Sequence, residues 1–212
     1  HRDSRGHDQI AKSGEVQWIN SGAGIIHSER PSEELIKGDK TQEIIQLWIN
    51  TPAKFKMYPP EYHYFPEDQI TVFLSEDKQV FNKLISGTYN GLTGNMKSHS
   101  EVIIIWGSSK ENGTIAYNVP SGYNSSLYVI KGQVFVKGFG LIDAENLAYF
   151  SLDGSLVDVE IKEEGTQFLL LAGKPINEKM AKHGPFVMNN ETEIMEAMRD
   201  YQMGKMGVLI ED

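Results

Sequence analysis

Short runs of alternating apolar and polar residues dominate the chain and predict β-strands rather than helices. A first series, rich in Ile, Val, Trp or Tyr, covers residues 15–20, 23–29, 43–50, 69–75, 102–107 and 114–119. A second series covers residues 126–130, 133–137, 148–152, 156–161 and 167–172. Short strands separated by turns at this spacing are typical of a sandwich or a barrel, so the pattern predicts an all-β protein.

Turn and helix signals support this interpretation. Lys131-Gly132 and Asp153-Gly154 each stand between two strand-like runs and favour hairpin turns. Only residues 191–203 carry an apolar stripe at helical spacing, and they predict one helix near the C-terminus that packs on a core. Asn190 or Thr192 could cap its start, and Gly204 stands where a glycine commonly ends a helix.

The chain is long enough for two domains. Its 212 residues can form two packed cores of about 100 residues each, or one large β domain. Residues 89–100 are rich in Gly, Asn and Ser, and we expect them to cross between two halves. The predicted domains are therefore residues 1–105 and residues 106–212, the second including the helix.

Composition narrows the function classes. Asp and Glu total 29 against 20 Lys and Arg, a net charge of −9, which argues against direct binding to nucleic acid. The absence of cysteine excludes disulfides, thiol catalysis and cysteine-ligated metals. No apolar run is long enough to predict a membrane span, and no signal peptide is visible, so we expect a cytoplasmic protein.

The most informative motif is His27-Ser28-Glu29 on a predicted strand. Side chains two apart on a strand point to the same side, so the imidazole and the carboxylate would face one small volume. Imidazole and carboxylate together suit a divalent transition metal, and iron above all where two histidines join one carboxylate. Two side chains do not hold a metal, however, and a His-x-Glu pair on a strand is more often simply exposed.

The other histidines offer no obvious partner. His1 and His7 could substitute for missing ligands, but a solvated turn is the expected setting for both. His63 is expected on a surface strand, and His99 lies in the polar crossing segment. His183 belongs to a His-Gly-Pro-Phe turn and is interpreted as structural.

Two glycines and two tryptophans complete the list of candidates. Gly22 and Gly24 resemble a phosphate loop in spacing, but no lysine or following helix supports nucleotide binding. They are expected to form a tight turn with positive φ ahead of the His27 strand. Trp18 and Trp48 fall in alternating patterns and are expected in a barrel core.

Several short motifs occur in a fixed order from one end of the chain to the other. They are HRDSRGH at 1–7, GEVQW at 14–18, SGAGIIHSE at 21–29, LWIN at 47–50, YPPEY at 58–62 and HGPFVMN at 183–189. Taken together, these motifs resemble the pirin family of the cupin superfamily.

The resemblance implies a bicupin, in which two β-barrels face each other and the N-terminal barrel alone holds a metal, described as iron. In the family two histidines of an H-P-H-type motif join one His and one Glu, which correspond to His27 and Glu29. The H-P-H motif does not occur in this chain. The remaining ligands are therefore expected upstream of His1, and the first barrel is expected to be incomplete at its start.

Three functions follow from the resemblance. The favoured one is a quercetin 2,3-dioxygenase activity, in which O₂ opens the ring of a flavonol-like substrate and Glu29 is both metal ligand and catalytic base. The alternative is an iron-dependent regulator that acts through a transcription factor or a metabolic enzyme, nuclear in eukaryotic members. The third is a truncated scaffold that binds no metal.

Overall fold

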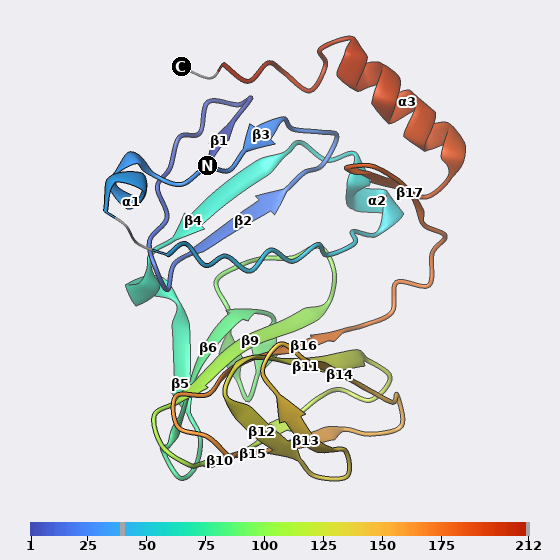
Figure 1. Cartoon of the computed structure of the whole chain (residues 1–212). Helices are drawn as coiled ribbons and strands as arrows, with labels where there is room; N and C mark the ends of the chain where they lie inside the picture. The colour runs from blue at the N-terminus through green and yellow to red at the C-terminus, as the bar shows by residue number, and fades with distance from the viewer. Residues whose placement is uncertain (39–40, 211–212) are drawn as a thin grey trace. The chain divides into compact units, whose positions relative to one another are not determined.

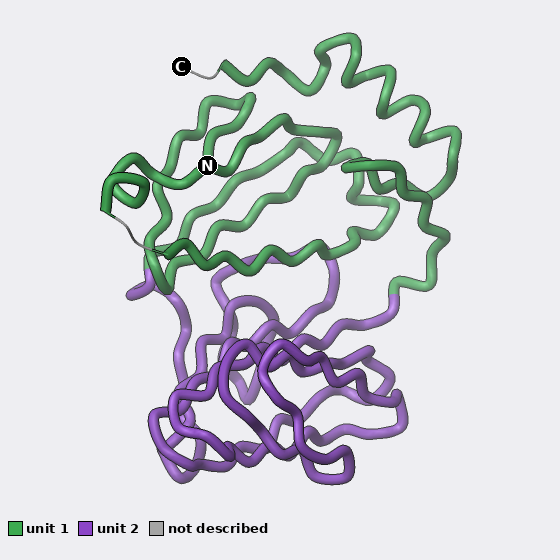
Figure 2. The backbone as a smooth tube through the Cα atoms, viewed as in Figure 1, with its two compact units in different colours: residues 1–66, 176–212 green, residues 67–175 purple. Residues whose placement is uncertain are grey.

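The computed structural model describes residues 1–38 and 41–210 and divides the chain into two compact units (Figure 2). The first unit is His1–Pro66 together with Ile176–Asp212, and the second is Glu67–Pro175. The expected domain boundary lies between residues 105 and 106. These residues lie inside β9 (Val102–Ser109), which pairs with β6 (Val80–Ser86) on one side and β16 (Gln167–Gly173) on the other, so the chain does not divide there. The C-terminal residues also return to the first unit instead of staying with the second.

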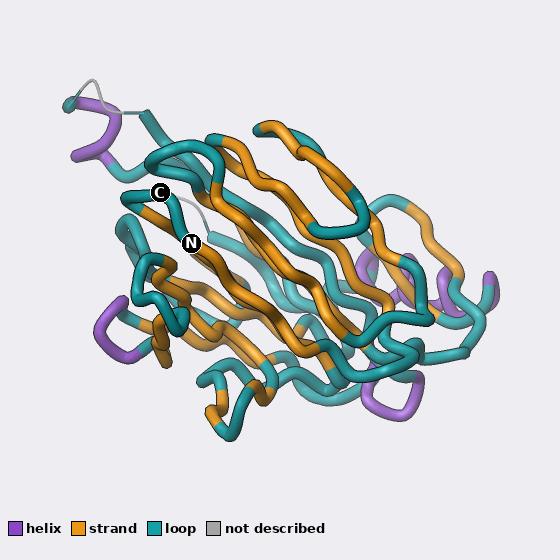
Figure 3. Tube along the Cα trace, turned by 90° about the horizontal axis from the view of Figure 1, so that it is seen from below, coloured by secondary structure: helices purple, strands orange, loops and turns teal. Residues whose placement is uncertain are grey.

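Two antiparallel sheets build the second unit. Figure 3 draws the strands of the chain in orange. One has six strands in the order β14-β11-β16-β9-β6-β5 and the other four in the order β10-β15-β12-β13. Besides β9, the strands are β5 (Thr71–Leu74), β6 (Val80–Ser86), β10 (Thr114–Asn118), β11 (Asn124–Lys131), β12 (Gln133–Val136), β13 (Gly140–Asp143), β14 (Leu147–Phe150), β15 (Leu156–Ile161) and β16 (Gln167–Gly173). A 3₁₀ turn (Glu67–Gln69) precedes β5, and the hairpin β7 (Thr88–Tyr89) with β8 (Leu92–Thr93) follows β6.

Side chains fill the interior of the second unit. Buried and exposed positions alternate along β10 and β15, as the period of two of a half-buried strand requires. Tyr117 and Phe168 are fully buried at its centre, and their rings meet edge to face. The Tyr117 hydroxyl donates to Asn82 Oδ1 at 2.5 Å, and the Asn82 amide donates to the Val80 carbonyl at 3.1 Å. This core is therefore both packed and satisfied in its hydrogen bonds.

Short ladders and helices build the first unit (Figure 1). Within its described residues, two-stranded ladders pair β1 with β3, β2 with β4 and β17 with β18. Their bounds are β1 (Arg2–Asp3), β2 (Val16–Asn20), β3 (His27–Ser28), β4 (Glu61–Phe65), β17 (Ala181–His183) and β18 (Phe186–Met188). The helices are α1 (Glu33–Lys37), α2 (Ala53–Lys56) and α3 (Glu191–Gln202).

The predicted C-terminal helix is confirmed. Asn190 Oδ1 accepts the backbone N–H of Glu193 at 3.0 Å, so Asn190 is the cap. Gly204 follows the helix with φ +73°, and Ile194 is buried. None of the helices in the described residues is long and apolar enough to span a membrane.

The all-β class is confirmed, but three segments differ from expectation. Residues 43–50 form no strand in the described part of the chain, because no neighbouring strand pairs with them. Ile44 and Trp48 are each 61% exposed there, so the expectation that Trp48 lies in a core is wrong. Of residues 23–29 only β3 is a strand, and residues 89–100 contain part of the β7–β8 hairpin instead of crossing between halves.

Candidate metal centre

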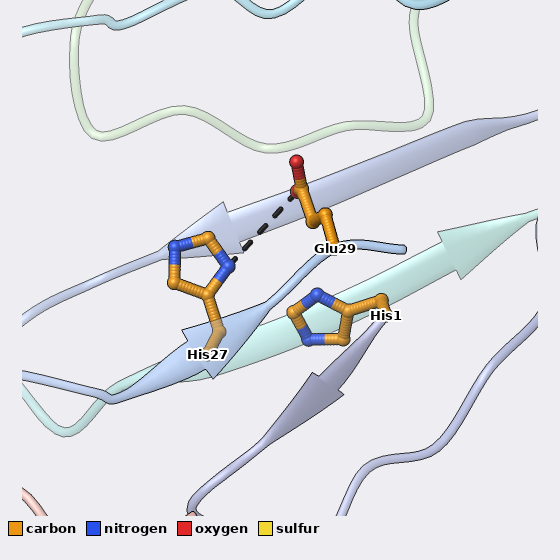
Figure 4. A group of neighbouring side chains, drawn as sticks. All are labelled: His1, His27 and Glu29. Atoms are coloured by element: carbon orange, nitrogen blue, oxygen red, sulfur yellow. Dashed lines mark ion pairs between the residues drawn. The ribbon is translucent and has the colours of Figure 1, made fainter. Parts of the chain in front are cut away.

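The candidate site lies on the antiparallel ribbon of β1 and β3, in the first unit. Its register places Asp3 opposite His27. Continued by one residue, the same register places His1 opposite Glu29. Directly opposite residues share a face of an antiparallel pair, as do residues two apart on one strand. All four side chains therefore face the same side of the ribbon, and Figure 4 shows three of them converging.

The donor atoms of this group are close together. His27 Nδ1 lies 3.9 Å from Glu29 Oε1, and each of the two side chains is about one-third exposed. The ligand atoms of His1, His27 and Glu29 all lie within 4.8 Å of one another. The strand spacing correctly predicts that His27 and Glu29 share one small volume, and the structure adds His1 to it.

His1 is the residue that the sequence reasoning considered but did not favour. It was expected in a solvated turn, but its side chain has no exposed surface. The ring stacks on Tyr62, with centroids 4.4 Å apart and planes 7° apart, and Nε2 lies 3.2 Å from Asp3 Oδ2. The signal that could have found it is the repeated spacing, since His1-x-Asp3 matches His27-x-Glu29 and each pair has one member on the β1–β3 ladder.

One atom of His1 tests whether a metal fits. Among the described residues, His1 Nδ1 is buried and has no hydrogen-bond partner. A buried polar atom left without a partner costs about 1–3 kcal/mol, so native proteins seldom contain one without a reason. A cation shared with His27 and Glu29 would supply the missing partner. The donor set of two imidazoles and one carboxylate is the set that non-haem iron favours.

Asp3 anchors the turn beside the site. Its Oδ1 accepts the backbone N–H groups of Arg5 at 2.9 Å and His7 at 3.1 Å, and its Oδ2 lies 2.8 Å from His7 Nδ1. Burial raises the pKa of Asp3, but the N–H groups of His7 and Arg5 and the His7 imidazole outweigh burial and hold the pKa below its usual value. His7 remains 40% exposed in this turn. The carboxylate therefore stays ionised next to the two imidazoles.

Glu29 is held from a second direction. Gln46 Nε2 donates to Glu29 Oε2 at 3.2 Å, while Oε1 is the oxygen nearer to His27. Gln46 belongs to residues 43–50, which form no strand among the described residues. This segment contacts the site through the Gln46 side chain.

The two glycines ahead of β3 form the tight turn that the sequence predicts. Gly22 has φ +50° and Gly24 has φ +121°. A Cβ on Gly22 would lie 2.1 Å from the Tyr58 carbonyl oxygen, which accepts the N–H of Ala23 at 2.9 Å. Only glycine fits this close approach of two backbones. The turn thereby sets where β3 begins.

The remaining histidines stay outside the site. His63 pairs with Glu61 at 3.4 Å on β4, where both are about half exposed, in agreement with its expected surface position. His183 lies at the end of the β17–β18 hairpin, opposite Phe186. Within residues 1–38 and 41–210, neither of these nor His99 joins the donor group.

Comparison with known proteins places these features in a family. A family model described as "Pirin" matches residues 1–49, and a model described as "Pirin C-terminal cupin domain" matches residues 106–207. Pirin-1 of Arabidopsis thaliana is 34% identical over 212 residues, which cover 98% of this chain and 71% of that protein. The chain belongs to the pirin family. Pirin of Rattus norvegicus is 30% identical, with coverage of 98% and 70%.

A solved structure that this chain resembles agrees with the fold. The crystal structure of quercetin 2,3-dioxygenase from Acinetobacter baumannii superimposes with a TM-score of 0.88 at 30% identity, over 99% of this chain and 72% of that one. The prediction of cupin-type architecture for this pirin-family chain is therefore confirmed. The chain spans about 70% of the length of these relatives.

Proposed function

We propose that this pirin-family chain is a metal-dependent oxidoreductase of the quercetin 2,3-dioxygenase type, with His27 and Glu29 as metal ligands and iron as the metal. The observation that carries the proposal is the convergence of one ligand atom each from His1, His27 and Glu29 within 4.8 Å of one another. Its substrate class is supported by the likeness to a protein named quercetin 2,3-dioxygenase. The substrate would be a flavonol-like aromatic together with O₂.

Iron would be held by His27 Nδ1 and a Glu29 carboxylate oxygen. When bound, the ion supplies Lewis acidity and one-electron chemistry with O₂. Both side chains are about one-third exposed, so a planar aromatic molecule can approach them from solvent.

Glu29 has a second role in this proposal. A flavonol must lose its hydroxyl proton before its ring can be oxidised, and a carboxylate beside the hydroxyl can take that proton. Gln46 donates to Oε2, which orients the carboxylate and leaves Oε1 on the His27 side. Glu29 is therefore the base that we assign, and Gln46 is the residue that positions it.

The test measures flavonol loss and O₂ uptake together after loading with Fe²⁺ under anaerobic conditions. Glu29→Gln removes the base and the anionic ligand while keeping the shape. We expect it to lower the rate by at least the roughly 10²-fold that general-base catalysis supplies. His27→Phe should abolish iron retention after gel filtration.

Glu61 and His63 provide a matched control because they form a second exposed His–Glu pair in the same unit. Glu61→Gln and His63→Phe should leave iron content and oxygen uptake unchanged. Equal losses in both pairs, or full turnover in Glu29→Gln, would contradict the assignment.

The second candidate function is regulatory, with the protein acting through protein partners. The observation that favours it is the exposed apolar surface of α3 and its end, where Met195 and Met203 are 63% and 64% exposed. Iron bound through His27 and Glu29, without any flavonol-dependent oxygen uptake, would favour this candidate over the dioxygenase.

A further inference from the structure

The chain after α3 runs back toward the β1–β3 ladder within the first unit (Figure 1). We call residues 204–210 the C-terminal segment. Its backbone is tightly turned, because the N–H of Lys205 donates to the Asp200 carbonyl at 3.0 Å. The N–H of Gly207 likewise donates to the Gly204 carbonyl at 3.1 Å. A protease cleaves such a backbone only when the segment opens locally.

The Ser4 hydroxyl joins this segment to the ladder. It donates to the Met206 carbonyl at 2.6 Å and accepts the backbone N–H of Ile26 at 3.1 Å. The backbone N–H of Ser4 also donates to the Ile26 carbonyl at 2.7 Å. Gly207 lies directly against Ser4, since a Cβ on Gly207 would come within 2.9 Å of the Ser4 Cβ. The C-terminal segment is therefore attached to the residues that follow β1 and precede β3.

The Met206 side chain packs on the turn ahead of β3. A Cβ added at Gly24 would lie 2.5 Å from Met206 Sδ and 2.7 Å from Met206 Cε, so the thioether occupies the space beside the Gly24 backbone. The N–H of Gly24 is already used, because it donates to the Ser21 carbonyl at 2.9 Å. The neighbouring N–H of Ala23 donates to the Tyr58 carbonyl. The contact is therefore close, and neither N–H is available to a new acceptor.

The chemistry of a thioether makes this contact sensitive to oxidation. Met206 is half-buried, so a small oxidant dissolved in water can reach its side chain. A peroxide transfers one oxygen atom to the sulfur, which gives up two electrons, while the O–O bond breaks and the peroxide leaves as water or an alcohol. The sulfoxide is larger and polar. Beside Gly24 its oxygen would be buried without a hydrogen-bond donor, which costs free energy.

We propose that Met206 is an oxidation site at which a peroxide releases the C-terminal segment from Ser4 and Gly24. The reduced thioether keeps the segment on the turn ahead of β3, and the sulfoxide leaves that turn and takes the Met206 carbonyl away from the Ser4 hydroxyl. Met195 and Met203 are 63% and 64% exposed, so their oxidation adds a polar group where water already solvates the side chain. The proposal involves no metal and does not depend on the proposed function.

The sequence around Met206 allows cleavage and oxidation to be measured together. Trypsin cleaves after Lys205, and the released peptide of residues 206–212 contains Met206 as its single methionine. Mass spectrometry of this peptide therefore gives the cleavage rate separately for the reduced and the oxidised chain after treatment with hydrogen peroxide. We expect cleavage about tenfold faster in the oxidised chain, the order by which one buried unpaired polar group shifts a local opening equilibrium.

A synthetic peptide of residues 204–212, reduced or oxidised, gives the intrinsic effect of the sulfoxide on trypsin, and the rates in the chain are divided by it. Equal corrected rates for the reduced and the oxidised chain would overturn the proposal. Methionine sulfoxide reductases for both epimers should restore slow cleavage. Cleavage that stays fast after the sulfoxide has been removed would show damage elsewhere in the fold, and would also overturn it.

Met206→Leu keeps an apolar side chain that peroxide cannot oxidise, so peroxide should not change its cleavage rate. Met203→Leu is the matched control, because Met203 is three positions away and mostly exposed. It should respond to peroxide as the wild type does. A response of Met206→Leu equal to that of the wild type would overturn the proposal, whatever the rate of the variant before treatment.

Ser4→Ala tests the other contact of the segment without any oxidant. The Met206 carbonyl loses its donor, and cleavage after Lys205 should become about two- to tenfold faster, as expected for one hydrogen bond. Ser151→Ala is the control, since the Ser151 hydroxyl bonds Asp153 in the second unit. An unchanged rate in Ser4→Ala would contradict the attachment of the C-terminal segment at Ser4.

Discussion

The two units treat buried polar groups in opposite ways. In the second unit the buried Tyr117 hydroxyl and the buried Asn82 amide satisfy each other inside a packed core. In the first unit the equally buried His1 ring pairs one nitrogen with Asp3 and leaves the other unpaired within the described residues. A satisfied buried pair stabilises a fold, whereas a buried polar atom without a partner needs an explanation, of which a bound ion is one. Burial alone does not separate structure from function.

A pair of carboxylates repeats the contrast. Asp77 accepts the N–H groups of Gln79 and Thr114 and the Ser75 hydroxyl, all within the second unit. Asp3 also accepts two backbone N–H groups, but its other oxygen faces two imidazoles. Asp77 therefore closes a turn, while Asp3 closes a turn and positions histidines.

The largest effect should come from the core of the second unit. Leu127→Ala removes a fully buried side chain from β11 and should lower the free energy of unfolding by about 2–5 kcal/mol. Leu141→Ala on β13 is the matched control, because Leu141 is 55% exposed and should change stability by roughly 0.5 kcal/mol or less. Urea denaturation measures both, and equal losses would mean that the second unit is not organised around this core.

Metal removal should act on the first unit alone. At a free Fe²⁺ concentration about 100 times Kd, binding stabilises the folded site by about 2.7 kcal/mol, and a chelator should reverse this. Hydrogen exchange under anaerobic conditions should show the added protection in β1 and β3, with the amides of β11 and β16 unchanged. Added protection in the second unit would contradict a metal site on β1 and β3.

The buried hydrogen bond of the second unit should have a smaller effect. Tyr117→Phe leaves the Asn82 carbonyl oxygen buried without its donor, which should cost about 1–3 kcal/mol of unfolding free energy. Tyr149→Phe is the control, since the Tyr149 hydroxyl bonds Asn124 at an exposed position. Metal affinity should be unchanged in both variants. A loss of affinity in Tyr117→Phe would show that the core of the second unit and the candidate metal site are coupled.

The sequence predicts the second unit better than the first. Periodicity locates β10, β12, β15 and β16 because each pairs with neighbours that bury one face. The same alternation in residues 43–50 predicts a strand, but none forms in the described residues because no strand pairs with this segment. The prediction fails because the pattern of one segment does not show whether it has a hydrogen-bonded partner. Strand pairing depends on what lies beside a segment, so local patterns fail where neighbours are few.

The candidate site shows the same limit. His27 and Glu29 could be found because they lie two apart on one strand, and that spacing fixes their side. His1 lies 26 positions from His27 and reaches it only through the register of β1 on β3. That register is a long-range pairing, and no local pattern in either segment specifies it. Local spacing therefore gives half of a site built across two strands.

The smallest expected effect concerns the pH dependence of stability in the second unit. Burial raises the pKa of Asp77, but the hydrogen bonds from Ser75, Gln79 and Thr114 together outweigh it and lower the pKa to about 2. A carboxyl whose pKa is lower in the folded state stabilises the fold above its unfolded pKa of about 3.9. The stabilisation is lost as the pH falls from there toward 2. Asp77 is exposed, so solvent screens the effect and the loss is modest.

Asp77→Asn should therefore be less stable than the wild type at pH 7, and urea denaturation should show the difference in unfolding free energy shrinking as the pH approaches 2. A difference that stays constant over this range would mean that packing at Asp77, and not its charge, holds the turn.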